Sequence, residues 1–559
     1  MRLLIIFSCL IAFFLARWFI LLRRSLQAAK KTGLPYICRP LHQGNLAYLL
    51  WMPILDCLID YLPDWLATIL DPRDYSGVYR NWRFKAGYEN HSVLGDVFLV
   101  VSPGFLALEV ADPHVCAQIT DRRMDFVKDF DLYLPLRVFG RNIIETEGET
   151  WKRHRRAVTP RYTDAIHTFV WDQATILGRE MLSEWKHLVD TNTPIQAPYT
   201  SREFRDLGTL ANRVVMAAVF GVSLSFRTGQ SPEELAVSEF AHSMETINAG
   251  LRLVLMFPQL IMPYVPGIGH LSKAMNHVTL YMTNFLDCHI NEKNKLEPST
   301  KVGILDGLMN ALAPPGTVPT EVQLSRSDVI GNMFALGFAG STTLTDTMHF
   351  SIVLLALYPK VQLWVMEELD QFVTEYGQQK DGWKYHKVFP KLVRLSCVLM
   401  ETLRLFPAVP MIPKYVEDKP QILSYKNDTF TLPPQTRIAL SACALHRNPH
   451  VWGADADKFR PERWLADDSK SLRPEPVEGS FVGFSRGARR CLGRRFAEVE
   501  YTAVLSEILR SCRIELAPEK PGETMEEMSL KVKKMLEMSN IDFTMHVGGR
   551  VLLRFVERF

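Results

Sequence analysis

One cysteine of this chain lies in a loop whose composition suits a metal ligand. The loop reads Phe-Ser-Arg-Gly-Ala-Arg-Arg-Cys-Leu-Gly from Phe484 to Gly493, with Cys491 near its end. Its glycines permit a tight turn in which backbone N–H groups face the sulfur. Its three arginines favour the thiolate over the thiol. Cys491 is therefore a candidate thiolate ligand, and the alternative is a buried cysteine in a basic loop.

The other cysteines limit which metal centre Cys491 could serve. The chain has 9 cysteines, an odd and scattered set without a CxxC pair. This pattern argues against a zinc site and against a disulfide framework, and it suits a reducing compartment. A lone thiolate can instead hold haem, which brings four nitrogens of its own and needs one axial ligand from the protein.

The pattern Phe-x-x-Gly-x-Arg-x-Cys-x-Gly resembles the haem-binding loop of the cytochrome P450 family. The resemblance implies that haem b is bound with its iron on the Cys491 thiolate. It also implies that Phe484, Arg489 and Gly493 contribute to the cofactor site. Four further segments follow the order expected for this family.

The first of these segments is Glu401-Thr-Leu-Arg404. Residues three apart on a helix share a face, so the carboxylate and the guanidinium can pair and both can reach a third partner. The resemblance implies that this partner is Arg463, in the segment Phe-Arg-Pro-Glu-Arg-Trp. The three residues would have a structural role, holding the chain that precedes the haem loop.

The second segment, Trp151-Lys-Arg-His-Arg155, resembles the helix that holds a haem propionate in this family. An indole N–H and a guanidinium one turn apart suit a carboxylate, although an ordinary basic amphipathic helix would look similar. Arg489 and Lys414 are further candidates for a propionate, and Lys414 offers a point charge where relatives often carry arginine. The third segment begins at His446 and reads His-Arg-Asn-Pro, and it resembles a part of the family that supports the fold.

The fourth segment is Ala339-Gly-Ser-Thr-Thr343, which resembles the family's oxygen-activating sequence. By resemblance, Gly340 lets the helix open or approach bound oxygen, and Thr343 holds the water chain that delivers protons. Thr342 occupies the position of the usual acid, and Asp346 lies one turn further along the same face. This departure leaves two alternatives to oxygen insertion: a rearrangement, dehydration or peroxide-using reaction, or a haem-binding membrane protein without catalysis.

The elements that position these residues are predicted to be mostly helices. Apolar periodicity and helix-end signals predict helices over residues 150–186, 203–221, 232–250, 270–294, 328–357, 360–376 and 387–405, and one that begins at Asp112-Pro113. Strands are predicted near 97–101, 107–110, 422–440 and 541–556. Ser327 or Asp328 could cap the 328–357 helix, whose polar middle argues against a membrane span. The predicted fold is mainly α with small β-sheets, as the resemblance to cytochrome P450 implies.

The beginning of the chain predicts a membrane anchor. Residues 3–22 are apolar over about the length of a bilayer, and Arg23, Arg24 and two lysines follow them. A small-residue cleavage site is lacking, so an uncleaved N-terminal transmembrane helix is favoured over a cleaved signal peptide. The predicted organisation is an anchor over residues 1–24, a membrane-proximal linker and amphipathic segment over 25–74, and a haem domain over 75–559.

The function that the resemblance implies is that of a haem-thiolate monooxygenase. A net charge of +3 gives no sign of nucleic-acid binding. No Gly-x-Gly-x-x-Gly follows a predicted strand, so electrons must come from another protein. Similar membrane-bound relatives imply NADPH-cytochrome P450 reductase, with cytochrome b5 as a possible second donor. They also imply a single pass through the endoplasmic reticulum membrane, with the catalytic domain in the cytosol. Basic residues near Trp151 and Cys491 could attract such an acidic flavoprotein.

The substrate is expected to be a lipophilic small molecule. Residues 251–269 are apolar and broken by prolines, and by resemblance they dip into the membrane near an access channel. Residues 126–142, 335–343 and 409–412 are the predicted pocket walls. The overall form resembles microsomal, fungal cytochromes P450 of specialised metabolism.

Overall fold

The computed structural model describes most of the chain as two compact units. The described residues are 2–39, 81–189, 202–226, 232–250, 253–254, 257, 259–293, 303–312, 319, 321–377, 383–541 and 544–558. The first unit comprises Met1–Asp129, Arg404–Lys458 and Pro474–Cys491, and the second comprises Phe130–Leu403, Phe459–Arg473 and Leu492–Phe559. Most of the predicted linker and amphipathic segment, residues 40–74, lies outside the described residues.

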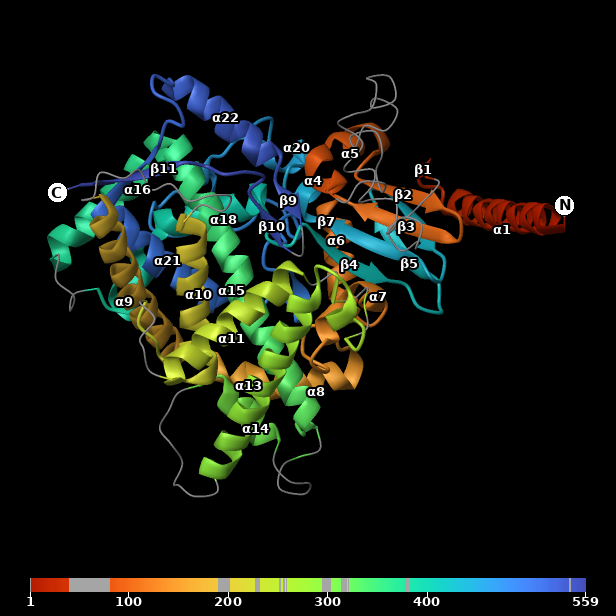
Figure 1. Cartoon of the computed structure of the whole chain (residues 1–559). Coiled ribbons are helices and arrows are strands. Elements are labelled where there is room, and N and C mark those ends of the chain that lie inside the picture. Colours follow the sequence, from red (N-terminus) through yellow and green to blue (C-terminus); the bar gives the residue numbers. More distant parts are fainter. Residues whose placement is uncertain are drawn as a thin grey trace. The chain divides into compact units, whose positions relative to one another are not determined.

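The first unit is built on a five-stranded sheet with the strand order β1-β2-β3-β7-β4. Its strands are β1 Tyr36–Cys38, β2 Val97–Ser102, β3 Phe105–Val110, β7 Arg437–Ser441 and β4 Met411–Tyr415 (Figure 1). Strands β1 and β2 are parallel, as are β3 and β7, while β2–β3 and β4–β7 are antiparallel. The predicted strands near 97–101 and 107–110 are confirmed. The predicted run 422–440 is three strands, because turns with positive φ at Lys426 and Gln435 divide it into β5 Gln421–Tyr425, β6 Asp428–Leu432 and β7.

Short helices surround this sheet in the same unit. They are α4 Trp82–Ala86, α5 Glu89–Leu94, α6 Pro113–Asp121, α19 Ala442–Leu445 and α20 Pro449–Trp452. The helix predicted from Asp112-Pro113 is confirmed as α6, because the Asp112 carboxylate accepts a hydrogen bond from the Val115 N–H at 2.8 Å. The long helix α1, Arg2–Thr32, packs its last turns on the apolar side of the sheet through Leu26 and Ala29, and its first part extends away from that sheet (Figure 1).

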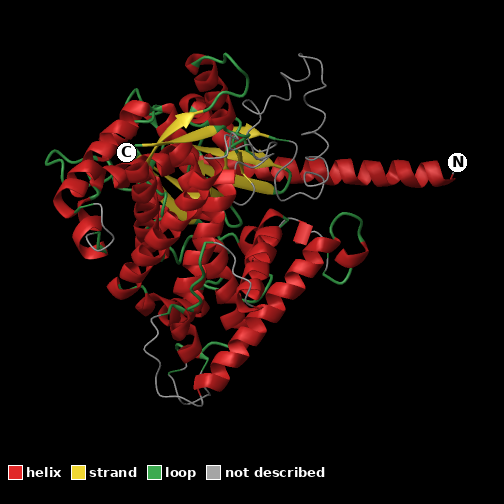
Figure 2. Ribbon diagram, turned by 60° about the vertical axis from the view of Figure 1, so that its left-hand side comes forward, coloured by secondary structure: helices red, strands yellow, loops and turns green. Residues whose placement is uncertain are grey.

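The second unit is mainly helical, as the sequence predicts (Figure 2). Its longer helices are α8 Gly148–Val158, α9 Asp164–Val189, α10 Arg202–Phe220, α11 Pro232–Ala249, α13 Gly269–Lys293, α14 Leu305–Ala311, α15 Arg326–Leu357, α16 Pro359–Tyr376, α18 Val393–Leu405, α21 Arg494–Ser511 and α22 Met525–Glu537. Helix α18 crosses into the first unit at its last two residues. Two small antiparallel sheets pair β8 Cys512–Leu516 with β11 Leu553–Glu557, and β9 Asn540–Ile541 with β10 Met545–His546.

Two predicted helices are each divided in the structure. The single helix predicted over 150–186 is wrong, since Pro160 lies in a 3-10 turn, Thr159–Arg161, that separates α8 from α9. The helix predicted over 387–405 is likewise interrupted by a 3-10 turn, Phe389–Lys391, which contains Pro390. A proline has no N–H to continue the helix hydrogen bonding, which explains both breaks.

Helix α15 is the longest helix of the second unit and is buried over most of its length. Ser325 caps it: its hydroxyl accepts from the Asp328 N–H at 3.1 Å, and the Asp328 carboxylate accepts from the Ser325 N–H at 3.0 Å. The cap predicted at Ser327 or Asp328 is therefore two or three residues too late. No single helix in the described part of the chain is both long and apolar enough to cross a membrane. Helices α15 and α16 taken together, bent by 108° at their junction, pass the same test on length and composition alone.

Candidate active site

The loop that carries Cys491 is closed on itself by backbone hydrogen bonds. The Cys491 N–H donates to the Phe484 carbonyl at 2.8 Å, and the Arg490 N–H donates to the Gly487 carbonyl at 3.2 Å. Gly487 has a φ of +65°, and a Cβ at this position would lie 2.8 Å from the Thr120 carbonyl oxygen of α6. Glycine is therefore required both for the turn and for the close approach of the loop to α6.

The Cys491 side chain is exposed and free of a disulfide bond. Burial, by contrast, raises the pKa of the Cys116 and Cys443 thiols to about 12 and also raises the pKa of Cys397. Those three thiols remain protonated at neutral pH and are poor ligands. Other exposed cysteines, such as Cys288 on α13, lie on regular elements, so Cys491 is distinguished by its loop.

Three of the arginines near Cys491 in the sequence are ion-paired within their own units. In the first unit, the Arg486 guanidinium lies 2.5 Å from Glu478 and 3.4 Å from Asp121. In the second unit, Glu498 pairs with Arg494 at 2.8 Å and with Arg495 at 3.5 Å. The positive charge that these arginines could offer an acidic partner is therefore smaller than the sequence alone indicates.

The Arg404 guanidinium is fully buried and organises the first unit through backbone carbonyls. It donates to the carbonyl oxygens of His446 at 2.7 Å, Ala456 at 2.5 Å and Lys458 at 3.1 Å. Its Cζ also lies 5.2 Å from the centre of the Trp452 ring. Arg404 thus holds together the segment of residues 446–458. Its motif alone did not predict these contacts with backbone carbonyls.

The Glu401 carboxylate, one turn earlier on α18, is fully buried in the second unit. It lies 3.0 Å from Nε of Arg463, so the structure brings these two predicted residues together. It also accepts hydrogen bonds from the Arg460 N–H at 2.9 Å and from the Trp464 indole N–H at 2.9 Å. The indole contact was not expected from the sequence, although Trp464 follows Arg463 directly.

The other predicted cofactor-binding side chains occupy ordered elements. In the second unit, Trp151 is buried on α8, and the Arg155 guanidinium lies over its ring at 5.5 Å from the ring centre. In the first unit, Lys414 is buried on β4 and its Nζ donates to the Phe126 carbonyl at 3.4 Å. Trp151 and Arg155 thus form one cationic and aromatic pair on one helix face.

The segment with Gly340 and Thr343 lies on a partly exposed stripe in the middle of α15, a helix that is buried over most of its length. The stripe contains Leu336, Ala339, Gly340 and Thr343, whose spacing of three and four residues places them on one face. The Thr343 hydroxyl donates to the Ala339 carbonyl at 2.8 Å. A Cβ on Gly340 would lie 2.9 Å from Cγ2 of Val215 on α10, so this glycine also permits close packing of two helices.

Comparisons with known proteins decide the family. The family model for cytochrome P450 matches residues 88–540. The chain belongs to the cytochrome P450 family. This cytochrome P450 is 27% identical to a cytochrome P450 monooxygenase of Arthrobotrys oligospora, over 94% of both chains. It is 28% identical to the phomenoic acid biosynthesis cluster cytochrome P450 monooxygenase of Leptosphaeria maculans, over 75% of both chains.

Solved structures agree on the fold of this cytochrome P450. A crystal structure of a cytochrome P450 superposes with a TM-score of 0.64 at 19% sequence identity, covering 85% of this chain and 94% of that one. The predicted P450 fold is thus confirmed, and with its monooxygenase relatives the chain is an oxidoreductase of the cytochrome P450 monooxygenase class.

The residues around Cys491 fit the haem that the family implies. An exposed thiol held in a glycine loop offers one ligand. Among the residues that the structure describes, no group of three or more His, Cys, Asp or Glu side chains is placed to hold a bare metal ion. A cofactor that brings its own four nitrogens needs only one ligand from the protein, which Cys491 could supply.

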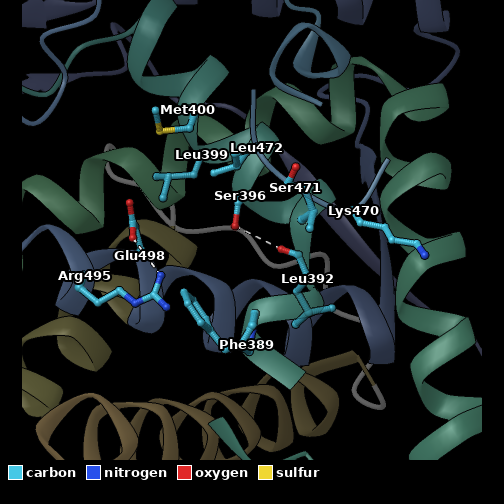
Figure 3. Close-up of a pocket in the computed structure, with 12 residues that line it drawn as sticks. Phe389, Leu392, Ser396, Leu399, Met400, Lys470, Ser471, Leu472, Arg495 and Glu498 are labelled. Carbon is cyan, nitrogen blue, oxygen red and sulfur yellow. Dashed lines mark hydrogen bonds and ion pairs between the residues drawn. The ribbon is translucent and has the colours of Figure 1, made fainter. Parts of the chain in front are cut away.

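Two cavities in the second unit of this cytochrome P450 differ in character. One, of about 230 Å³, lies between α18, residues 470–472 and the start of α21, with Phe389, Leu392 and Leu399 around it (Figure 3). None of the predicted pocket walls lines it. The other, of about 280 Å³, is polar and includes Arg137, Gly140 and Arg141, which belong to the predicted wall 126–142.

Proposed function

We propose that this cytochrome P450 is a haem-thiolate monooxygenase that inserts one oxygen atom of O2 into a lipophilic small molecule. The observation that carries the proposal is the exposed Cys491 thiol, in a loop held by the hydrogen bond from the Cys491 N–H to the Phe484 carbonyl and by the close contact of Gly487 with α6. Thiolate-ligated haem supplies oxygen activation, because the thiolate favours cleavage of the O–O bond.

The remaining site residues would bind and orient the cofactor and the reacting groups. Trp151 and Arg155 on α8 present an indole and a guanidinium that suit a propionate, and Arg489 and Lys414 would add further positive charge. Thr343 would bind protic groups at its Oγ1 on the accessible stripe of α15.

The proposed location is the endoplasmic reticulum membrane, with a single N-terminal span and the haem domain in the cytosol. Large apolar side chains of α1, among them Phe13, Phe14 and Phe19, are more than half exposed. Basic residues at 23, 24, 30 and 31 follow them, which supports an anchor with a cytosolic domain after it. In the second unit, Leu260 and Tyr264 are 86% and 85% exposed, which supports a membrane contact within 251–269.

The proposed electron donor is NADPH-cytochrome P450 reductase in the same membrane, with cytochrome b5 as a second donor. A reductase is required because two electrons must reach the iron for each oxygen atom inserted. The proposed substrate belongs to specialised metabolism. The relative from Leptosphaeria maculans, described as part of a phomenoic acid biosynthesis cluster, supports this assignment.

The test uses microsomes prepared from cells that express the protein with and without the reductase. The reduced carbonyl complex of the wild type should show the thiolate-type absorption band. Cys491→Ala should abolish it, whereas Cys288→Ala, which removes an exposed cysteine on α13, should leave it intact. A thiolate band in Cys491→Ala would exclude Cys491 as the ligand.

A second candidate is a rearrangement, dehydration or peroxide-using reaction on the same haem site. It is favoured by Thr342, which occupies the position of the usual acid on α15. Candidate lipophilic substrates should be incubated with the microsomes, and the products analysed with NADPH and reductase or with peroxide alone. Product formation without NADPH and reductase would favour this second candidate, and strict dependence on both would support the monooxygenase.

A further inference from the structure

His446 joins the Arg404 region to the segment that leads into the Cys491 loop. Its ring is fully buried in the first unit. The Nε2 atom lies 2.9 Å from the Val482 backbone nitrogen, and Nδ1 lies 3.2 Å from the Arg404 carbonyl oxygen. The Phe481 ring stacks on the imidazole with 4.9 Å between ring centres. The two ring nitrogens of His446 therefore contact two different backbone groups, the Arg404 carbonyl and the Val482 N–H.

The two partners of the His446 ring determine its protonation pattern. A backbone N–H can only donate, so Nε2 must accept the hydrogen bond from Val482. A carbonyl oxygen can only accept, so Nδ1 must carry the hydrogen and donate to Arg404. The ring is thus neutral with its hydrogen on Nδ1. The backbone carbonyl of His446 in turn accepts from the Arg404 guanidinium at 2.7 Å, which makes the link between the two residues reciprocal.

Val482 transmits this link to the loop through two further backbone hydrogen bonds. The Ser485 N–H donates to the Val482 carbonyl at 2.8 Å and closes a turn at residues 482–485. The Phe484 carbonyl in that turn accepts from the Cys491 N–H at 2.8 Å. Three consecutive hydrogen bonds therefore connect the His446 ring with the residue that bears the sulfur.

We propose that His446 is a positioning residue for the Cys491 thiolate. It fixes the Val482 N–H, and with it the turn whose carbonyl holds the Cys491 backbone. The proposal rests on the proposed role of Cys491 as the haem ligand. The neighbouring Asn448 is equally buried, but its side-chain amide donates elsewhere, to Asp96 and to the Ala111 carbonyl, both at 3.1 Å.

Two amide variants separate positioning from simple packing. In His446→Gln, the amide oxygen can reach the place of Nε2 and still accept from Val482. In His446→Asn, the shorter side chain reaches only the place of Nδ1, so the buried Val482 N–H loses its acceptor. Asn448→Ala is the matched control, because the buried hydrogen bonds that it removes from the same segment go to Asp96 and Ala111.

The measurement is the ratio of thiolate to non-thiolate carbonyl complex in each purified full-length variant, together with its thermal unfolding midpoint. We expect His446→Asn to shift this ratio toward the non-thiolate form by about tenfold, the factor that corresponds to the loss of one buried hydrogen bond. His446→Gln should retain the wild-type ratio. Asn448→Ala should lower the unfolding midpoint without changing the ratio.

Equal ratios in His446→Asn and the wild type would overturn the proposal, as would an equal shift in Asn448→Ala. If the wild type itself lacked the thiolate band, the proposed function would fail before the variants were compared. Should His446→Asn not accumulate as folded protein, hydrogen exchange of the wild type decides. The peptide that contains Val482 should then exchange slowly, and exchange as fast as in an unfolded chain would refute the role of His446.

Discussion

Replacing Glu401 by glutamine tests the buried ion pair before the haem loop with almost no change of shape. In the native site, Oε1 accepts from the Arg460 N–H and from Arg463 Nε, and Oε2 accepts from the Trp464 indole. A glutamine has one oxygen and one NH2 group, so at least one of these donors must face another donor. The substitution also removes the negative charge beside the Arg463 guanidinium, whose side chain is only 7% exposed.

The expected cost follows from these contacts. Removing one partner of a buried ion pair costs about 3–5 kcal/mol, because the remaining charge stays in a poorly solvated place. The sum of one lost charged hydrogen bond, about 1.5–3 kcal/mol, and one buried donor facing a donor, about 1–3 kcal/mol, has the same size. Since folded domains are stable by about 5–15 kcal/mol, the variant should be severely destabilised.

The assay is unfolding in guanidinium chloride followed by circular dichroism, with haem content measured in parallel. Glu367→Gln is the matched control: Glu367 pairs with Arg394 at 3.1 Å, but its side chain is 67% exposed, so its loss should cost less than about 1 kcal/mol. If Glu401→Gln were no less stable than Glu367→Gln, the buried pair would not stabilise the second unit and the reasoning from burial would be wrong.

Three further predictions concern single positions. Burial raises the pKa of the Glu500 carboxyl far above its ordinary value. The contribution of Glu500 to the free energy of unfolding should therefore fall as pH rises from about 4.5, by at most about 1.4 kcal/mol per pH unit. Denaturant titrations at several pH values should show that Glu500→Gln lacks this contribution. Gly340→Ala should cost about 1–3 kcal/mol through contact with Val215, and Val215→Ala should recover part of the loss in a double-mutant cycle. Gly487→Ala should lower haem content at unchanged expression, because the new Cβ meets the Thr120 carbonyl in a left-handed conformation.

Elements with local signals were predictable from the sequence, although only some of them were predicted. Helix α6 follows from Asp112 and Pro113 alone, since the cap is made by residues next to each other in the chain. Helix α22 was not predicted, although Thr524 and Glu527 form a capping box whose spacing was readable. The break at Pro160 was equally readable, because a proline inside a helical pattern ends the helix.

The candidate site was predictable where the family's motif names both partners, and not where a contact depends on how distant segments meet. Glu401 and Arg463 were paired in this way, and the structure places them 3.0 Å apart. The carbonyl oxygens around Arg404, and the Val482 N–H that donates to the His446 ring, are backbone groups of segments distant in the chain. Backbone groups are the same at every residue, so no sequence pattern identifies them.

The hydroxyl groups of α15 show how a helix can be polar in its middle and still be buried. Ser341, Thr343, Thr345 and Thr347 each donate to the carbonyl oxygen four residues earlier, at 2.7 to 3.0 Å, so the helix itself accepts these protons. A hydroxyl that donates in this way keeps lone pairs that can accept a hydrogen bond. In the proposed reaction Thr343 would therefore orient a donor such as water and would not release its own proton. Because residue 342 is a threonine and not an acid, the protons would then have to be passed to that water by solvent.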